Sequence, residues 1–234
     1  MCEVLVAVAH GSKDPRAAAA VSALTALVAE RAPGLDVRTA FLDHAAPSLA
    51  QVLSSVPADS RVTVLPLLLT AAYHSKIDIP RLLGRRDVGY GAPLGPHPLL
   101  LRALEHRLAE DSYHGTAVVL ASAGSSDPEA NAVIARTAAA WQRSRGWRAV
   151  VPAFASAASP TPAEAVRALR ADGARRVVVA TYLLAPGFFA DRVRDTSLAA
   201  GASFVSPALG ALPEVAVVLL ERYAEAAARE TRAA

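Results

Sequence analysis

The chain has a single cysteine, a small net charge and no long basic run with aromatic residues, and these shortages exclude two kinds of protein. Cys2 is the only cysteine in the 234 residues, so neither an internal disulfide nor a metal site of several thiolates is possible. The formal net charge is only +3, and the basic residues are scattered along the chain. Without a long basic run or interleaved aromatic side chains, we expect no nucleic-acid partner.

Long apolar runs and nucleotide-binding motifs are also missing. No apolar stretch approaches the ~20 residues that a membrane-spanning helix needs, and no basic leader precedes the first apolar run. We therefore expect no membrane association and a cytoplasmic protein. The sequence has no P-loop, no G-x-G-x-x-G turn after the first strand and no G-x-S-x-G elbow. These absences predict chemistry without ATP, NAD or a serine nucleophile, and without an organic cofactor.

Short β-branched runs alternate with helical segments, and this alternation predicts the fold class. Asp14 can cap the first helix, and Pro15 suits its first position. The βαβαβαβα order predicts an α/β fold with a parallel sheet covered on both faces. In the first half we expect strands over 4–9, 37–41, 62–68 and 88–92, and helices over 15–31, 47–55, 77–83 and 98–110. In the second half we expect strands over 117–121, 149–154, 177–183 and 203–205, and helices beginning near Pro128, Pro160-Thr161-Pro162, Phe189 and Pro213.

The second half of the chain repeats the first. VAVAHGSKDP ends at Pro15 and VVLASAGSSDP ends at Pro128, 113 residues later, and AFLDHAAPS and AFASAASPT have the same spacing. RVTVLPLLL and RVVVATYLL lie 115 residues apart, as do PLGPHP and ALGALP. Four agreements in the same order predict a tandem duplication. We expect two flavodoxin-like halves, 1–112 and 113–234, each with a four-stranded parallel sheet flanked by helices, facing each other across a cleft.

The first half carries two histidines that the second half lacks. His10 follows the first strand and His74 follows the third, where the second half has Ala123 and Phe189. The first and third strands are neighbours in flavodoxin-like sheets, and ligands bind at the carboxyl ends of the strands. We therefore expect the two imidazoles to face each other, where they can bind a divalent transition metal or accept protons. Each histidine taken alone is equally consistent with a loop residue bonded to the backbone.

A carboxylate at the end of the second strand can complete this site. Asp43 stands there, and its counterpart in the second half is Ser156. The carboxylate can bind a metal or orient an imidazole, or it can simply lead into the next helix. His44 is expected to point elsewhere if the strand geometry continues.

Other polar residues of the first half have structural alternatives. His97 can line the same cleft or be a surface turn histidine, and the second half has Leu212 in its place. Gly11-Ser12 recurs as Gly124-Ser125 without the histidine, so turn formation and helix capping are the favoured roles for that pair.

The motifs AHGSKDP, FLDHAAPS and PLLLTAAYHSKIDIP resemble the CbiX/SirB group of class II chelatases, which insert a divalent metal into a tetrapyrrole without ATP. The most specific part is Pro-Leu-Leu-Leu, four residues, His, three residues and Asp-Ile-Pro at 66–80. The resemblance covers the whole chain, because long members have two halves. It implies that His10 and His74 bind the metal and act in catalysis. It makes Asp43 the third ligand, at a position where many relatives have glutamate.

The resemblance also implies a reaction. The expected activity is sirohydrochlorin ferrochelatase in siroheme synthesis, with a cobaltochelatase of the cobalamin route as its near neighbour and Fe2+ or Co2+ as substrate. A non-catalytic metal or tetrapyrrole carrier can use the same histidines. A phosphoryl-transfer enzyme with His10 as nucleophile is a third possibility, which needs clustered arginines around His10.

A carboxylated macrocycle needs cations and an apolar surface. Phe188 and Phe189, beside Tyr182, can form a flat apolar face, although core packing is the alternative for them. We expect a monomer, because the duplication provides both halves, with a homodimer as the alternative. The expected substrate contacts are Ser12, Arg16, Tyr73, His97 and Phe189, and the further arginines considered are Arg81, Arg192 and Arg194.

Overall fold

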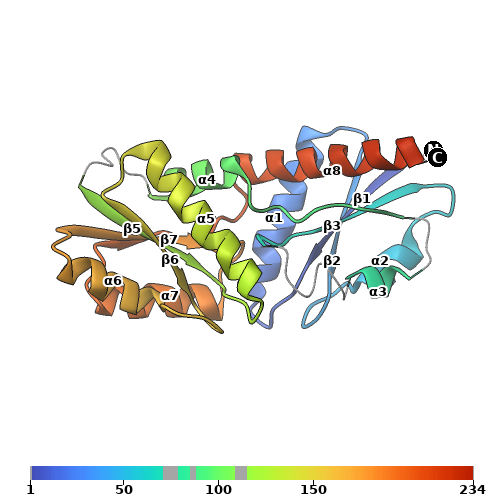
Figure 1. The fold of residues 1–234 in the computed structure, drawn as a ribbon. Helices are drawn as coiled ribbons and strands as arrows, with labels where there is room; N and C mark the ends of the chain where they lie inside the picture. The colour runs from blue at the N-terminus through green and yellow to red at the C-terminus, as the bar shows by residue number, and fades with distance from the viewer. Residues whose placement is uncertain (1, 71–78, 85–87, 109–114, 234) are drawn as a thin grey trace. The chain divides into compact units, whose positions relative to one another are not determined.

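The computed structural model describes residues 2–70, 79–84, 88–108 and 115–233, and these residues form two parallel four-stranded sheets (Figure 1). In each sheet the first strand along the chain lies between the second and the third, so the order is β2-β1-β3-β4 and β6-β5-β7-β8. The expected flavodoxin-like neighbours are confirmed. The strands are β1 (Glu3–Ala9), β2 (Asp36–Phe41), β3 (Arg61–Pro66), β4 (Gly89–Tyr90), β5 (Thr116–Ser122), β6 (Ala149–Phe154), β7 (Arg176–Tyr182) and β8 (Phe204–Val205).

A helix follows each strand. Within the described ranges, none of these helices has the length and hydropathy needed to cross a bilayer. The helices are α1 (Pro15–Arg31), α2 (Leu49–Ser55), α3 (Ile79–Leu83), α4 (Pro98–Leu108), α5 (Pro128–Arg145), α6 (Pro162–Ala171), α7 (Phe188–Ala199) and α8 (Pro213–Ala233).

Some bounds differ from the expected ones. β3 ends at Pro66 instead of residue 68, yet the next amide, that of Leu67, still donates to the Val8 carbonyl oxygen at 2.7 Å. β4 has only two residues, and Gly91 continues the pairing by donating to the Val64 carbonyl oxygen at 3.0 Å.

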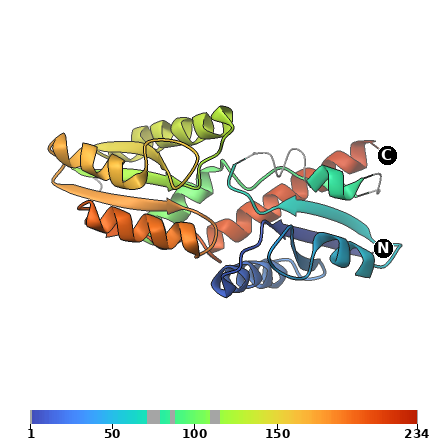
Figure 2. The ribbon, with the colours of Figure 1, turned by 90° about the horizontal axis from the view of Figure 1, so that it is seen from below.

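Both faces of the first sheet are buried, which is why β1 is an almost unbroken apolar run. Side chains alternate between the faces of a strand, so Val4, Val6 and Val8 point to one face and Leu5 and Ala7 to the other. All five are fully buried. The three valines share one core cluster with apolar residues of α2 and α3. In the second sheet, Val119 of β5 packs in the same way with α6 and α7, which lie on one face (Figure 2).

The two compact units of the structure differ from the two halves of the sequence. Unit 1 contains residues 1–99 and 210–234, and unit 2 contains residues 100–209. Helix α8, the last helix of the second half, packs against α1 and β3 of unit 1, while most of α4 belongs to unit 2. The expected boundary at 112/113 therefore separates the two sequence repeats but not the two packing units. The last helix of each repeat, α4 or α8, belongs to the unit formed mainly by the other repeat.

Corresponding arginines hold the exchanged helices in place. Arg222 of α8 donates to the carbonyl oxygens of Pro93 at 2.9 Å and Leu94 at 3.5 Å, all within unit 1. Arg107 of α4 donates to the Leu209 carbonyl oxygen at 2.8 Å, within unit 2. Arg107 precedes Arg222 by 115 residues, and Leu94 precedes Leu209 by the same number. In each unit, an arginine of the exchanged helix thus donates a hydrogen bond to the equivalent loop carbonyl oxygen.

A buried carboxylate also fixes α4 within unit 2. The Glu105 side chain is 10% exposed and accepts hydrogen bonds from Trp141 Nε1 at 2.8 Å and from the Arg145 guanidinium at 2.7 and 2.6 Å. Because a buried charge is costly unless it is paired, Glu105 strongly favours the packing of α4 on α5.

The repeated glycine is required by a close approach of two loops. Gly11 has φ 94°, and a Cβ placed on it would lie 1.7 Å from the Asp43 carbonyl oxygen. Gly124 has φ 84°, and its Cβ would lie 1.9 Å from the Ser156 carbonyl oxygen. Both halves therefore need glycine here for backbone reasons.

We expect Gly124→Ala to destabilise the protein by at least about 3 kcal/mol, because left-handed strain adds to a clash with backbone. Gly173→Ala is the matched control: Gly173 also has positive φ (80°), but its Cβ would meet only a side-chain atom at 3.9 Å. The control should lose only about 1 kcal/mol. Thermal unfolding followed by circular dichroism measures both variants, and equal losses would contradict the close-approach explanation.

Candidate functional site

The candidate site lies at the carboxyl edge of the first sheet. His10 directly follows β1, and Asp43 lies two residues after the end of β2. Since β1 pairs with β2 in parallel up to Ala9 and Phe41, both chain segments leave the sheet at the same edge. His10 is exposed, as an open ligand-binding position requires.

A backbone hydrogen bond joins these two segments. The Asp43 amide donates to the His10 carbonyl oxygen at 2.9 Å, and in the second half the Ser156 amide donates to Ala123 at the same distance. This hydrogen-bonded pair of loops, which we call the loop framework, is therefore repeated in both halves. The side chains on the two copies differ. The expectation that β1 and β2 bring His10 and Asp43 together agrees with this geometry at the level of the backbone.

The position of His44 differs from the expectation that it points elsewhere. Strand geometry ends at Phe41, and His44 adopts a left-handed conformation with φ 59°. Its Nδ1 lies 3.3 Å from Asp43 Oδ1, and its backbone amide donates to the same oxygen at 2.7 Å. His44 thus places an imidazole beside the Asp43 carboxylate. Its counterpart, Ala157, has nearly the same φ of 57°, so the turn itself does not require histidine.

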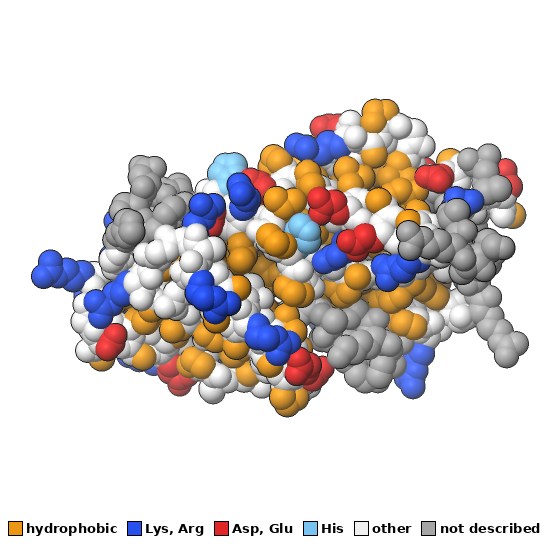
Figure 3. All heavy atoms as spheres, turned by 45° about the horizontal axis from the view of Figure 1, so that its top comes forward, with side chains coloured by type: hydrophobic (Ala, Val, Ile, Leu, Met, Phe, Trp, Pro, Cys, Tyr) orange, Lys and Arg blue, Asp and Glu red, His pale blue; other side chains and the backbone are white. Residues whose placement is uncertain are grey.

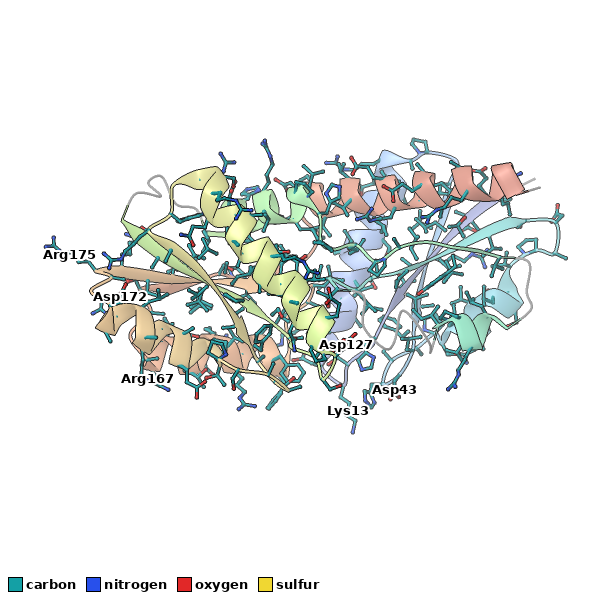
Figure 4. All side chains as sticks on the ribbon, viewed as in Figure 1. Lys13, Asp43, Asp127, Arg167, Asp172 and Arg175 are labelled. Atoms are coloured by element: carbon teal, nitrogen blue, oxygen red, sulfur yellow. The ribbon has the colours of Figure 1, made fainter. Side chains whose placement is uncertain are left out.

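Lys13 adds a cation at this edge and was not among the predicted site residues. Figure 4 shows its side chain and that of Asp43 at the same end of unit 1, on the loops that follow β1 and β2. The Lys13 side chain is exposed, and the second half has Ser126 in its place. The same comparison of halves that singled out His10 could have found it.

Ser12 and Arg16 shape the start of α1. Ser12 Oγ accepts from the Asp14 amide at 3.1 Å, and the Asp14 carboxylate caps α1 by accepting from the Arg16 amide at 2.9 Å. The Arg16 guanidinium also binds this carboxylate, and these hydrogen bonds hold the pKa of Asp14 below its usual value. Ser125 repeats the turn in the second half. The expected turn-forming role of Ser12 is confirmed, whereas the cap itself is Asp14 and substrate contacts of Ser12 and Arg16 stay predictions.

His97 has partners for both ring nitrogens. Nδ1 accepts from the Leu99 amide at 3.2 Å, and Nε2 lies 3.1 Å from a carboxylate oxygen of Glu221. His97 therefore matches the second of its two expected roles, that of a turn histidine, and it directly precedes α4. A contact with substrate would have to replace one of these two interactions.

His74 and Tyr73 lie outside the described residues, so their predicted roles stay predictions. Among the residues that the structure does describe, no group of three or more His, Cys, Asp or Glu side chains is arranged to hold a metal ion. The predicted ligand set of His10, Asp43 and His74 includes a residue outside the described ranges and therefore stays a prediction.

The carboxyl edge of the second sheet presents apolar groups. Phe188 and Phe189 open α7 and are 71% and 40% exposed, so neither is a core residue. Tyr182, which was expected beside them on an apolar face, is only 1% exposed. Burial raises the pKa of its hydroxyl, and its ring belongs to the core. The expectation for Tyr182 is wrong because the last residue of β7 points inward.

Charged side chains of both signs are mixed on the face shown in Figure 3. Arginine and lysine lie there among acidic and apolar side chains, without one continuous basic area among the residues drawn in colour. This distribution suits individual contacts with a small anionic ligand better than tracking of a polyanion.

The fold defines a class: α/β proteins that contain two flavodoxin-like halves in tandem. The chain belongs to the CbiX family, whose model matches residues 4–111 and again residues 117–226. The family model therefore matches each half of the chain separately.

Curated relatives carry two related names. The chain is 28% identical over 204 residues to a sirohydrochlorin cobaltochelatase of Priestia megaterium, covering 80% of this chain and 66% of that protein. It is 29% identical over 182 residues to a sirohydrochlorin ferrochelatase of Bacillus subtilis (strain 168), covering 72% of this chain and 70% of that protein. The matches thus span about two thirds of the length of these relatives.

A solved structure, SirB from Bacillus subtilis with Fe3+, has a similar fold. It superposes with a TM-score of 0.83 and 26% sequence identity, covering 99% of this chain and 98% of that one.

Proposed function

We propose that this protein inserts Fe2+ or Co2+ into sirohydrochlorin without ATP, as a step of siroheme or cobalamin biosynthesis. The observation that carries the proposal is the asymmetry within a complete duplication. Both halves match the family and share the loop framework, yet only the first has His10, Asp43 and His74 where the second has Ala123, Ser156 and Phe189.

In this proposal His10 and His74 hold the metal substrate and Asp43 completes the ligand set. Imidazole nitrogens suit first-row divalent metals such as iron and cobalt. The hydrogen bond from the Asp43 amide to the His10 carbonyl oxygen keeps the two ligand-bearing segments in register. His44, beside Asp43, orients the carboxylate through its backbone amide.

Insertion exchanges one divalent cation for two pyrrole N–H protons. The imidazole that releases the metal to the macrocycle is then free to accept the first proton when it lies within hydrogen-bond reach of the ring, and the second proton leaves to solvent. No bond of a nucleotide is broken, so the contribution of the protein is to hold metal, macrocycle and base together. Lys13 supplies a cation for the carboxylates of the macrocycle at the same edge.

The test is anaerobic metal insertion followed by the absorption change of sirohydrochlorin, with substrate in large excess over protein and no nucleotide present. We expect many turnovers per chain with Fe2+, Co2+ or both, well above the rate without protein. The ratio of kcat/KM for the two metals then shows which metal the protein inserts more efficiently.

A non-catalytic carrier is the alternative, because binding needs the same ligands as insertion. The same assay separates the two functions. A carrier would give one equivalent of bound metal or tetrapyrrole per chain and no rate above the spontaneous one, and this result would overturn the proposed activity.

A further inference from the structure

Two adjacent aromatic rings are exposed at the carboxyl edge of the second sheet, where parallel α/β folds bind ligands. The segment after β7 leads directly into Phe188 and Phe189, the first two residues of α7. Their ring centroids lie 5.6 Å apart in an edge-on arrangement with an interplanar angle of 63°. Single exposed apolar residues are ordinary, but a contacting pair at a ligand-binding edge indicates an aromatic or apolar ligand.

A cation lies within one helical turn of the rings. Arg192 follows Phe188 by four residues and Phe189 by three, so it shares their side of α7. Its side chain is exposed and has no hydrogen bond or ion pair with any residue that the structure describes.

The other arginine of this helix segment is already paired. Arg194 lies 3.3 Å from Asp191 and 2.9 Å from Asp195. Arg192 is therefore the cation of this segment whose guanidinium has no carboxylate partner among the described residues. An apolar face next to one cation matches a flat macrocycle that carries carboxylates at its rim.

We propose that Phe188, Phe189 and Arg192 form a tetrapyrrole-binding surface of unit 2, in which the rings contact the macrocycle and Arg192 pairs with one of its carboxylates. This inference rests on the proposed function for the identity of the macrocycle. It gives the half without metal ligands a role in binding the substrate.

The experiment is a titration of the full chain with metal-free sirohydrochlorin, followed by absorption, together with steady-state metal insertion. We expect the double variant Phe188→Ala, Phe189→Ala to raise Kd and KM about tenfold or more, because two aromatic contacts are lost. Arg192→Ala should raise them about fivefold. The value of kcat at saturating tetrapyrrole should stay within about twofold of the wild-type value, because these residues bind substrate without touching the metal ligands.

Two matched controls come from the same unit. Phe204→Ala removes a ring that is 37% exposed on β8, and Arg167→Ala removes an exposed arginine of α6. Both should leave Kd unchanged. The conservative variants Phe188→Tyr and Arg192→Lys should recover most of the binding. The effect of Arg192→Ala should shrink at high salt, and that of the phenylalanines should persist.

The outcomes separate this inference from the proposed function. If the wild-type chain binds sirohydrochlorin without turnover and the variants bind it more weakly, the surface stands and the catalytic function fails. If the wild type turns over and the double variant keeps its Kd, the surface is wrong. If the double variant changes only the sedimentation coefficient, the rings contact a second copy of the chain and the proposal is overturned. A wild type that does not bind sirohydrochlorin overturns both.

Discussion

Replacing His10 with alanine is expected to lower kcat/KM for metal insertion by about a hundredfold or more. In the proposed mechanism the imidazole is both a metal ligand and a candidate proton acceptor, and general acid–base catalysis alone typically contributes at least that factor. His74→Ala should have an effect of similar size. Direct titration with Co2+ should show weaker metal binding in both variants, because each loses one of the two nitrogen ligands.

His106→Ala is the matched control for these variants. It removes another exposed imidazole, on α4 of unit 2 and outside the predicted ligand set, and should keep wild-type activity. Wild-type kcat/KM in both His10→Ala and His74→Ala would overturn the site assignment. Loss of activity with unchanged Co2+ binding would show that the histidines act on protons alone.

A fragment of residues 98–209 is expected to fold on its own, whereas a fragment of residues 113–234 is not. The first contains unit 2 with α4, including the Glu105 pairs with Trp141 and Arg145. The second is a complete repeat by sequence but lacks α4. It also carries α8, whose Val215, Val218 and Leu219 are fully buried in the intact protein.

The expected difference is large compared with the stability of a domain. Leu100, Leu104 and Leu108 of α4 are at most 3% exposed, and burying each such side chain contributes about 1.5–3 kcal/mol. Their combined loss is comparable to a net domain stability of about 5–15 kcal/mol. Circular dichroism melting and sedimentation should show a cooperative monomer for 98–209 and an aggregating or non-cooperative chain for 113–234. Equal, cooperative melting of both fragments would contradict the exchange of helices.

Local patterns were sufficient to predict the elements and their pairing. Short β-branched runs and the Asp14-Pro15 and Asp127-Pro128 starts mark strands and helices, and the parallel order places the strand ends at one edge. That edge joins the segments of His10 and Asp43, as the backbone hydrogen bond between them shows. The facing of His10 and His74 stays a prediction, because His74 lies outside the described residues.

Features that depend on packing or on turn conformation could not be predicted from the sequence. His44 faces Asp43 because the chain leaves the strand at Phe41 and turns left-handed, which the alternation of strand side chains does not indicate. Tyr182 and Phe188 belong to one short apolar stretch, but only the tertiary structure decides that the first is buried and the second exposed.

The sequence by itself determined the duplication, the parallel α/β class and the restriction of the predicted metal ligands to one half, because these follow from local order and residue identity. The tertiary structure decided which sheet each terminal helix covers. The apolar face of an amphipathic helix indicates that this face is buried. It does not indicate against which sheet, because two sheets with the same strand order offer similar apolar surfaces. Specific contacts made the choice: Arg222 binds the carbonyl oxygens of Pro93 and Leu94, and Glu105 of α4 pairs with Trp141 and Arg145.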